Sequence, residues 1–326
     1  MCLACLLVSG CGTNAPGSLT KGLGGGGSAA TPNVSTGAQM GLVWNSADST
    51  LRSLVGVPGS TQLGPALFPA GAYTAGAFAS PTQTALLIDP KGNLQSLVLP
   101  ATQPETLTQS VSPASSIVFA PRGAYAAVFV PGSASVLVVG GLPQAPTVNT
   151  LTAAAAIQGA SISDAGTLLL ATGKASITVT SFTAAGTHST LATLAGFGGM
   201  SFIAGSEDSL LADSAANTLT RFHNGTASIL ATHANGLNQP FAVAASQDGH
   251  WAVTADQADG TLLRIDLTGT TAPTQSTCAC SPNQLSALNG NAVFQLTAPA
   301  AAPGWMIEAD GPASRVLFIP PVRSGQ

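Results

Sequence analysis

The sequence predicts an all-β fold built by repeating one unit of short strands. Hydrophobic residues make up 45% of the 326 residues, and charged residues only 7%. The apolar residues occur in runs of about four to eight, which is the length of a buried strand and too short for most helices. The 37 Gly and 22 Pro residues supply frequent turns between these runs. No run of about 18 or more apolar residues occurs, so the sequence predicts no membrane-spanning helix.

Similar strand pairs recur along the chain at a nearly constant distance. Residues 209–225 read SLLADSAANTLTRFHNG, and the pattern returns at 41–56, at 250–269 and, more loosely, at 85–100. The runs that we assign to second strands start about 40–45 residues apart, with one longer step before the last, and this period fits four short strands per unit. These runs are 42–44, 86–88, 127–130, 168–170, 210–212, 251–254 and 305–307.

A β-propeller, which is a ring of four-stranded blades, explains this period. Seven second strands predict seven blades; six blades remain the alternative, with 41–64 serving as closure or as an extra hairpin. A β-sandwich pair would also hold regular short strands, but it would not need so long a fixed repeat. In the unit 240–278, PFAVAAS is expected to be the inner strand, followed by QDG, HWAVTAD, TLLRIDL and TAPTQST. Small residues are expected in inner strands because these strands crowd around the ring axis.

The two ends of the repeat are incomplete in the sequence. The first unit, 41–65, lacks an inner strand, and the last unit, 291–322, has three strands but no clear outer one. Ring closure removes exposed strand edges, and propellers commonly close by joining strands from both ends of the chain in one blade. Here the missing pieces are complementary, but they do not add up to one blade.

The turn after the inner strand carries a family resemblance. It reads APRG at 120–123, SDAG at 163–166 and GSED at 205–208. Gly supplies the positive φ of such turns, and Asp or Ser hydrogen-bonds the local backbone. These turns resemble the Ser-Pro-Asp-Gly turn of YVTN/NHL-type and WD40-like propeller repeats, and the resemblance extends over 39–322. It implies the propeller fold but no particular substrate.

The N-terminus resembles the lipobox of bacterial lipoproteins. An apolar run at 3–8 is followed by Ser9, Gly10 and Cys11. Small residues before the cysteine would let a membrane-embedded peptidase reach the bond, and the thiol of Cys11 would take the lipid. One or two acyl chains on a terminal cysteine attach a protein to a membrane without a spanning segment.

This resemblance sets the expected domain organisation. We expect a signal peptide at 1–10, a lipidated Cys11 with a flexible Gly- and Ser-rich tether at 11–38, and the propeller at 39–326. No Lys or Arg precedes the apolar run, and the run is shorter than the usual signal-peptide core; a true start upstream of Met1 would account for both. The expected location is the bacterial cell envelope, periplasmic or at the outer surface, or secreted if Cys11 is not lipidated.

A polar residue recurs where second strands are expected to end. One interpretation is a ring of carboxylates at one mouth of the propeller, which would bind a cation or a polar ligand. The favoured interpretation is structural, because one Asx residue followed by small turn residues is what a hairpin turn requires, whereas calcium needs several oxygens converging in one loop. The recurring positions are Asn45, Asp89, Asp213, Asp256 and Asp310.

Cys278 and Cys280 form the one cysteine pair expected in the mature protein, because Cys2 and Cys5 fall in the predicted signal peptide and Cys11 is the lipidation site. In an oxidising compartment the pair is expected to form a disulfide that staples the loop between the last two blades. A redox role is the alternative. A metal site is disfavoured, since two thiols lack two further ligands nearby.

No other motif predicts a metal, a cofactor or a catalytic centre. The sequence contains no H-E-x-x-H motif and no G-x-S-x-G motif, and the histidines are expected to be solvated on loops or strand edges. Arg221 and Arg264 occupy the same place in their third strands and are expected to be solvated between blades. The four histidines are His188, His223, His233 and His250.

The charge distribution limits the function. The net charge is −4, and the nine Lys and Arg residues are scattered, so a nucleic-acid partner is not expected. We expect a monomeric binding or scaffold module for a protein, peptide or envelope polymer, which contacts the membrane through its lipid anchor only. The alternative is a propeller enzyme, because the YVTN/NHL group includes lyases, lactonases and quinone-dependent dehydrogenases. Such enzymes gather His, Glu or Asp at the central mouth, and Glu105, Glu207 and Glu308 are not placed to do so.

Overall fold

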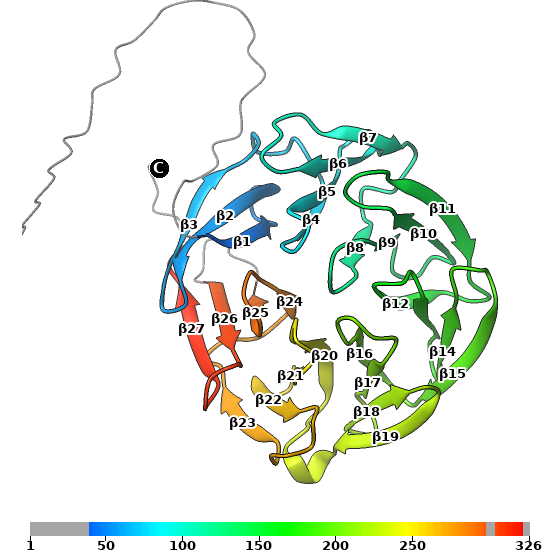
Figure 1. The fold of residues 1–326 in the computed structure, drawn as a ribbon, viewed down its shortest axis with the longest axis vertical. Coiled ribbons are helices and arrows are strands. Elements are labelled where there is room, and N and C mark those ends of the chain that lie inside the picture. The colour runs from blue at the N-terminus through cyan, green and yellow to red at the C-terminus, as the bar shows by residue number, and fades with distance from the viewer. Residues whose placement is uncertain (1–38, 298–303, 322–326) are drawn as a thin grey trace, which may run out of the picture. The chain divides into compact units, whose positions relative to one another are not determined.

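The computed structural model describes residues 39–297 and 304–321. These residues form 27 strands and one short 3-10 helix, η1 (His233–Asn235). The strands make seven antiparallel sheets, and each sheet is one blade of a β-propeller (Figure 1). The predicted all-β, seven-bladed architecture is therefore confirmed, and the six-bladed alternative is wrong.

The blades are numbered here in chain order, and their strands follow one another from the ring centre outward. The first blade holds β1 (Gln39–Asn45), β2 (Thr50–Val57) and β3 (Ser60–Ala66). The second holds β4 (Ala75–Ala79), β5 (Thr84–Ile88), β6 (Leu94–Val98) and β7 (Glu105–Thr108). The third holds β8 (Ser116–Phe119), β9 (Ala126–Phe129), β10 (Ser135–Gly140) and β11 (Thr147–Thr152).

The later blades repeat the four-stranded pattern. The fourth holds β12 (Ile157–Ile162), β13 (Leu168–Gly173), β14 (Ile177–Phe182) and β15 (His188–Leu194). The fifth holds β16 (Phe197–Phe202), β17 (Ser209–Asp213), β18 (Thr218–His223) and β19 (Thr226–Ala231). The sixth holds β20 (Pro240–Ala245), β21 (Trp251–Asp256), β22 (Thr261–Asp266) and β23 (Thr274–Thr277). The seventh holds β24 (Ser286–Ala287), β25 (Val293–Thr297), β26 (Gly304–Glu308) and β27 (Arg315–Ile319).

The last blade differs from its prediction. Residues 305–307 belong to β26, which is the third strand and not the second. The last of the three strands recognised in 291–322 is the outer strand β27, and the strand that the sequence did not reveal is the inner strand β24. The inner strand β24 has only two residues, too short to give a sequence signal. With β25 as the second strand, the second strands of the second to seventh blades start 41 or 42 residues apart, so the apparent longer step disappears.

The first blade lacks an inner strand among the described residues, as predicted. The direction of β1 shows this. Its start lies beside the turn between β24 and β25, where the Asn289 amide donates to the Met40 carbonyl at 2.7 Å. Its end lies beside the start of β4, where a Cβ on Gly76 would come within 2.8 Å of the Trp44 ring. β1 therefore runs antiparallel to β4, in the direction of a second strand.

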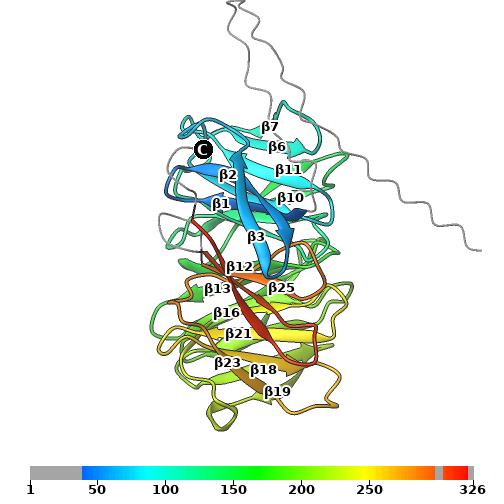
Figure 2. The same cartoon turned by 90° about the vertical axis from the view of Figure 1, so that its left-hand side faces the viewer.

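The hydrophobic core lies between the blades. The buried apolar residues fall into seven clusters, and each cluster joins two neighbouring blades. The cluster between the first and seventh blades consists of aliphatic side chains and methionines, among them Met40, Leu54, Leu288, Met306 and Ile319. Burying a Leu, Ile or Met side chain contributes about 1.5–3 kcal/mol. In the described residues the ring thus closes by packing, and β3 and β27 lie side by side at the closure (Figure 2).

No helix in the described part of the chain is long and apolar enough to cross a membrane.

Candidate binding channel

The inner strands enclose a central cavity of about 750 Å³. Inner strands crowd together around it, which explains their small residues. A Cβ on Gly198 would lie 2.5 Å from the Pro240 carbonyl oxygen, and one on Gly199 would lie 2.8 Å from the Ala242 Cα. Only glycine allows β16 to approach β20 this closely, because real Cβ atoms do not approach backbone atoms below about 3 Å.

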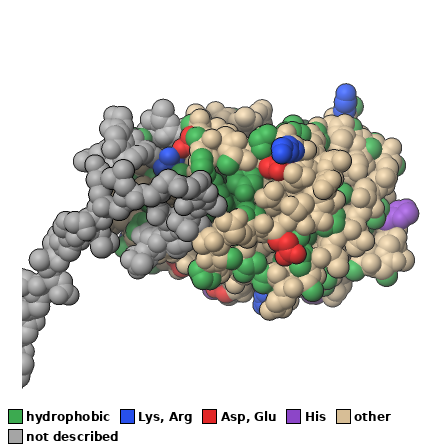
Figure 3. Space-filling model, turned by 90° about the horizontal axis from the view of Figure 1, so that it is seen from above, with side chains coloured by type: hydrophobic (Ala, Val, Ile, Leu, Met, Phe, Trp, Pro, Cys, Tyr) green, Lys and Arg blue, Asp and Glu red, His purple; other side chains and the backbone are tan. Residues whose placement is uncertain are grey.

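The lining of this cavity is electrically neutral. All of its described residues are apolar, hydroxyl-bearing or amide-bearing, and none is an acid, a base or a cysteine. Hydroxyl and amide side chains supply the polar groups away from β4 and β8, namely those of Ser46, Ser161, Ser201, Gln247, Asn283, Gln284, Ser286 and Gln295. The side of the molecule seen in Figure 3 also carries few Lys, Arg, Asp and Glu side chains. Recognition in this channel must therefore rest on shape, apolar contact and neutral hydrogen bonds.

The lining is not evenly shared among the blades. Residues of β4 and β8 line the cavity along their whole lengths, and residues 283–288 line it around β24. The fourth blade contributes Ser161 alone, whereas β1 contributes Leu42, Val43 and Trp44. More lining residues therefore come from the first blade and its two neighbours than from the fourth blade. In the first blade the innermost described strand is β1, which has the direction of a second strand.

Hydrogen bonds between turns fix one mouth of the channel. The turns that follow the inner strands gather there, and Asp164 accepts from the amides of Arg122 at 2.7 Å and Gly205 at 2.9 Å. This carboxylate links the third, fourth and fifth blades. Gln247 of the sixth blade donates from Nε2 to the Pro121 carbonyl of the third blade at 3.1 Å. Asp164 lies in the SDAG turn that the sequence pattern singles out, whereas no pattern indicates Gln247, whose contact spans the ring.

The recurring polar positions do not converge on a common site. Asn45, Asp89, Asp213 and Asp256 follow strands of the same direction, whereas Asp310 follows the third strand β26 and lies in a turn of the opposite direction. Grouping Asp310 with the others was therefore wrong. Asp310 is exposed.

Most of these side chains bind their own turn. The Asn45 Oδ1 accepts from the Ala47 amide at 3.1 Å. Asp89 accepts from the amides of Lys91 at 2.8 Å and Asn93 at 2.9 Å. Burial raises the pKa of Asp89, but the hydrogen bonds from Asn93 and Lys91 outweigh it and lower the pKa below the ordinary value.

Asp213 and Asp256 occupy equivalent places in neighbouring blades but differ in their hydrogen bonding. Asp213 accepts from four amides, those of Ala195, Gly196, Ala215 and Ala216, at 2.7–3.0 Å.

Asp256 is fully buried. Its Oδ2 accepts from the Asn238 amide at 2.8 Å, and its Oδ1 has no hydrogen-bond partner among the described residues. Burial raises the pKa of Asp256 to about 6, with a smaller contribution from the nearby charge of Asp259. The sequence pattern placed Asp213 and Asp256 in one class, and the structure separates them by their number of donors.

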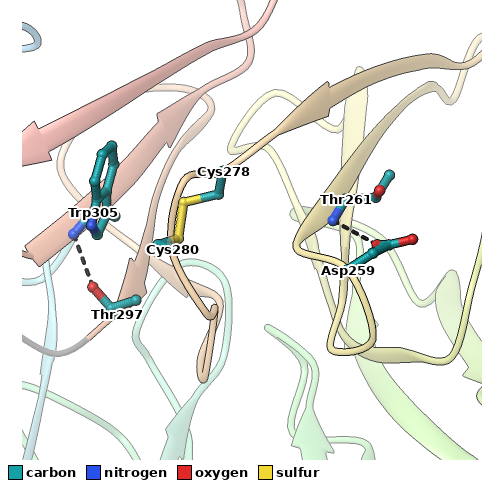
Figure 4. The surroundings of a disulfide bond; sticks show 6 residues. All are labelled: Asp259, Thr261, Cys278, Cys280, Thr297 and Trp305. Atoms are coloured by element: carbon teal, nitrogen blue, oxygen red, sulfur yellow. Dashed lines mark hydrogen bonds between the residues drawn. A yellow bond between two sulfur atoms is a disulfide. The ribbon is translucent and has the colours of Figure 1, made fainter.

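The structure joins Cys278 and Cys280 by a disulfide, with their Cα atoms 5.0 Å apart. The bond lies on the connection from β23 to the seventh blade (Figure 4). Cys278 is buried in the apolar cluster between the sixth and seventh blades, and its amide donates to the Gly260 carbonyl at 3.1 Å. The pair therefore holds a loop at a blade boundary. Cys11 and the predicted signal peptide and tether lie outside the described residues.

Arg221 and Arg264 do not share one environment. Arg221 binds Asp208 through Nη2 at 2.6 Å, and His223 Nδ1 lies 2.8 Å from the same carboxylate. Arg264 is buried instead of solvated, so that expectation was wrong. Its guanidinium stacks 3.9 Å from the Trp251 ring centre and donates to the Gly311 carbonyl of the next blade at 2.7 Å.

No cluster of three or more His, Cys, Asp or Glu side chains within the described ranges is arranged to hold a metal ion.

Comparison with known proteins gives the fold alone. No family model matches the chain, and no curated protein matches it by sequence. Among solved structures, a functionally unknown protein from Desulfotomaculum acetoxidans superposes with a TM-score of 0.61 at 11% identity, over 87% of this chain and 100% of that one.

Two further solved structures superpose on more than three quarters of the chain. The β-propeller domain of Cps50 (Swd1) from Myceliophteria thermophila superposes with a TM-score of 0.57 at 11% identity, over 77% of this chain and 87% of that one. A chain of a mitotic checkpoint complex gives 0.56 at 10% identity, over 78% and 86%. The chain is thus a seven-bladed β-propeller with WD40-like structural neighbours.

Proposed function

We propose that this protein is a binding module of the bacterial cell envelope, lipid-anchored through Cys11, that holds an uncharged segment of a protein, peptide or envelope polymer. The observation that carries the binding proposal is the neutral lining of the 750 Å³ channel. Catalysis of the lyase, lactonase or dehydrogenase type would use acids, bases or metal ligands at this place. A neutral channel can still give specificity through shape and hydrogen bonds.

The structural neighbours support a binding role by analogy only, because fold does not determine function. One of them is a chain of a mitotic checkpoint complex, which is an assembly of proteins. The Ser-Pro-Asp-Gly-like turns support assignment to the YVTN/NHL type, and the lipobox-like residues before Cys11 support the anchor and the envelope location.

The binding proposal is tested with capped peptides of about ten residues that are rich in Ala, Ser and Thr, compared with the same peptides carrying Lys or Glu. Trp44 lines the cavity, so its fluorescence reports occupancy. The neutral peptides are expected to bind, with an affinity that changes little between about 0.05 and 0.5 M salt because no ion pair forms.

A matched pair of variants locates the site. Ser161→Lys places a charge on the cavity wall and is expected to weaken binding about 10-fold or more, because a buried unpaired charge is costly. Ser228→Lys places the same charge on the exposed strand β19 and is expected to have no effect. Equal effects of the two substitutions, or preferred binding of the charged peptides, would contradict the proposal.

The anchor is tested separately, in cells that express the chain behind a working secretion signal. Labelling with an alkyne fatty acid is expected to mark the wild-type protein, and Cys11→Ser is expected to remove the label and release the protein from the membrane fraction. An unchanged membrane fraction for Cys11→Ser would contradict lipid anchoring at this residue.

A further inference from the structure

The inner edge of β1 presents backbone groups to the central channel. Leu67 donates its amide to the Leu51 carbonyl at 2.8 Å, so the backbone of Leu51 points toward β3. Leu51 faces Trp44 in the register of β1 and β2, and the direction of the backbone groups alternates along an antiparallel ladder. The amides and carbonyls of Trp44 and Leu42 therefore point away from β2, toward the centre of the ring.

These inward groups have no backbone partner among the residues that the structure describes. In the six other blades the corresponding edge is paired with an inner strand. Leu42 and Trp44 both line the cavity, and Leu42 is only 6% exposed. Because a backbone group that is buried without a hydrogen bond is costly, this edge favours pairing with another backbone.

The side chains of β1 do not cover this edge. Those of Leu42 and Trp44 pack in the apolar cluster shared with the second blade, and that of Val43 packs in the cluster shared with the seventh blade. This arrangement follows from the pleat, because the side chains of a strand project from its two faces. β1 therefore offers the channel a strip of main chain, in which the two inward-facing residues lie about 7 Å apart.

We propose that the ligand of the channel is an extended peptide segment of another protein, which adds to β1 as the inner strand of the first blade. This inference rests on the proposed function, since it concerns the same channel and specifies how an uncharged segment binds there. Strand addition is a recurring mode of peptide recognition in which main-chain hydrogen bonds supply the affinity. Of the ligand classes proposed above, a polypeptide repeats N–H and C=O groups at the spacing of Leu42 and Trp44.

The surrounding walls define the direction, length and side chains of this segment. β1 lies between β4 and β24 around the ring (Figure 1). The segment runs antiparallel to β1 and in the direction of β4, and the inner strands of the other blades set its length at two to six residues. Ala75, Gly76 and Ala77 of β4 and Leu285 and Leu288 around β24 line the cavity. These walls are uncharged, so the segment carries small, uncharged side chains such as those of Ala, Gly, Ser and Thr.

The test uses peptide N-methylation, which removes a backbone donor and leaves the side chain unchanged. Three capped seven-residue peptides share one sequence of Ala, Ser and Thr. One is unmodified, one is N-methylated at its positions 2, 4 and 6, and one is N-methylated at its positions 3, 4 and 5. The second peptide keeps one whole strand edge free. The third, with the same number of methyl groups, lacks a donor in every pair of alternate residues that could face Leu42 and Trp44.

The two methylated peptides are expected to differ in affinity, measured by Trp44 fluorescence. The peptide with one free edge is expected to bind about as tightly as the unmodified one. The peptide with both edges blocked is expected to bind about 10-fold or more weakly, because two main-chain hydrogen bonds cannot form together in any register.

Hydrogen exchange of single amides in the full chain locates the contact. Saturating unmodified peptide is expected to slow the exchange of the Leu42 and Trp44 amides about 10-fold or more. The Val43 amide, which points toward its partner Arg52 in β2, is expected to keep its rate. The amides of β13, where an inner strand is present, show whether the ring itself stays folded.

The contrary results are distinguishable. Equal binding of the two methylated peptides, with unchanged exchange at Leu42 and Trp44, would overturn strand addition and leave the binding function standing. Failure of all three peptides to bind would refute the peptide-binding function and this inference with it. Slow exchange of Leu42 and Trp44 without peptide would overturn the proposal by assigning the edge to the chain itself, or to a second copy if the rate depends on protein concentration. Protection by a neutral oligosaccharide and by no peptide would also overturn it, in favour of a polymer ligand.

Discussion

The buried carboxyl of Asp256 is expected to make the protein less stable as pH rises through the neutral range. Its Oδ1 lacks a hydrogen-bond partner among the described residues, and burial raises its pKa from 3.8 to about 6. In the unfolded chain the group returns to its ordinary pKa. Between these two values the folded state holds a proton that the unfolded state has lost, so folding is favoured by low pH.

The magnitude follows from the shift. A change of about two pKa units at about 1.36 kcal/mol each gives about 3 kcal/mol. This contribution is fully present below pH 4, is lost as the pH rises through about 6, and is absent above about pH 7. Asp256→Asn removes the titration and is expected to flatten this part of the stability curve. The variant need not be more stable at high pH, because its amide N–H replaces Oδ1 and is left without an acceptor.

The assay is urea unfolding at intervals between pH 4.5 and 8, for the wild type and Asp256→Asn. Asp89→Asn is the control, because the pKa of Asp89 is lowered and its contribution to stability is lost only as the pH falls below the ordinary range, so this substitution is expected to leave the slope between pH 4.5 and 8 unchanged. Identical slopes for the wild type and Asp256→Asn between pH 5 and 7 would refute the account of a buried, poorly solvated carboxyl.

Three further experiments test the contacts between blades and strands. Arg264→Ala is expected to lower the free energy of unfolding in urea by about 3 kcal/mol, because its hydrogen bonds and its stacking on Trp251 are lost. Arg264→Lys is expected to recover only part of this stability. Full recovery would mean that the planar guanidinium over the Trp251 ring is unimportant. Gly198→Ala is expected to cost about 2 kcal/mol or more because its Cβ would meet backbone, whereas Gly311→Ala, with its nearest neighbour 3.4 Å away, is expected to be tolerated; equal melting points would argue against the close approach. Thiol titration of the unreduced mature protein is expected to find Cys278 and Cys280 unreactive until a reductant is added, and free thiols at these positions would exclude the disulfide.

The repeat could be predicted from the sequence because the two central strands of most blades are apolar runs. β5, β9, β13, β17 and β21 were all located within a few residues. The ends were harder, since β24 has two residues and its pairing with β25 depends on the ring around it. The direction of β1 also became evident only from its contacts with Asn289 and Gly76.

The site was less predictable because its properties depend on contacts between distant blades. The sequence gives Asp213 and Asp256 the same context, and only the number of amides that reach each carboxylate distinguishes them. The burial of Arg264 likewise depends on the carbonyls of Ala309 and Gly311 in the next blade. The low charge of the whole chain is consistent with the neutral channel. Which residues line the channel could not be predicted, because they come together only when the ring is assembled.

The seven clusters between the blades make the mechanics of this protein differ from those of a linear repeat array. In an open array the terminal units have one neighbour and fray first. Here each blade is held on both sides, so no blade can leave without breaking two apolar contacts at once. Cutting the chain in any loop between blades should therefore preserve the ring. Weakening one of the seven contacts should instead separate two neighbouring blades and open the ring there. The contact between the first and seventh blades is the natural place for such an opening, because no covalent connection spans it.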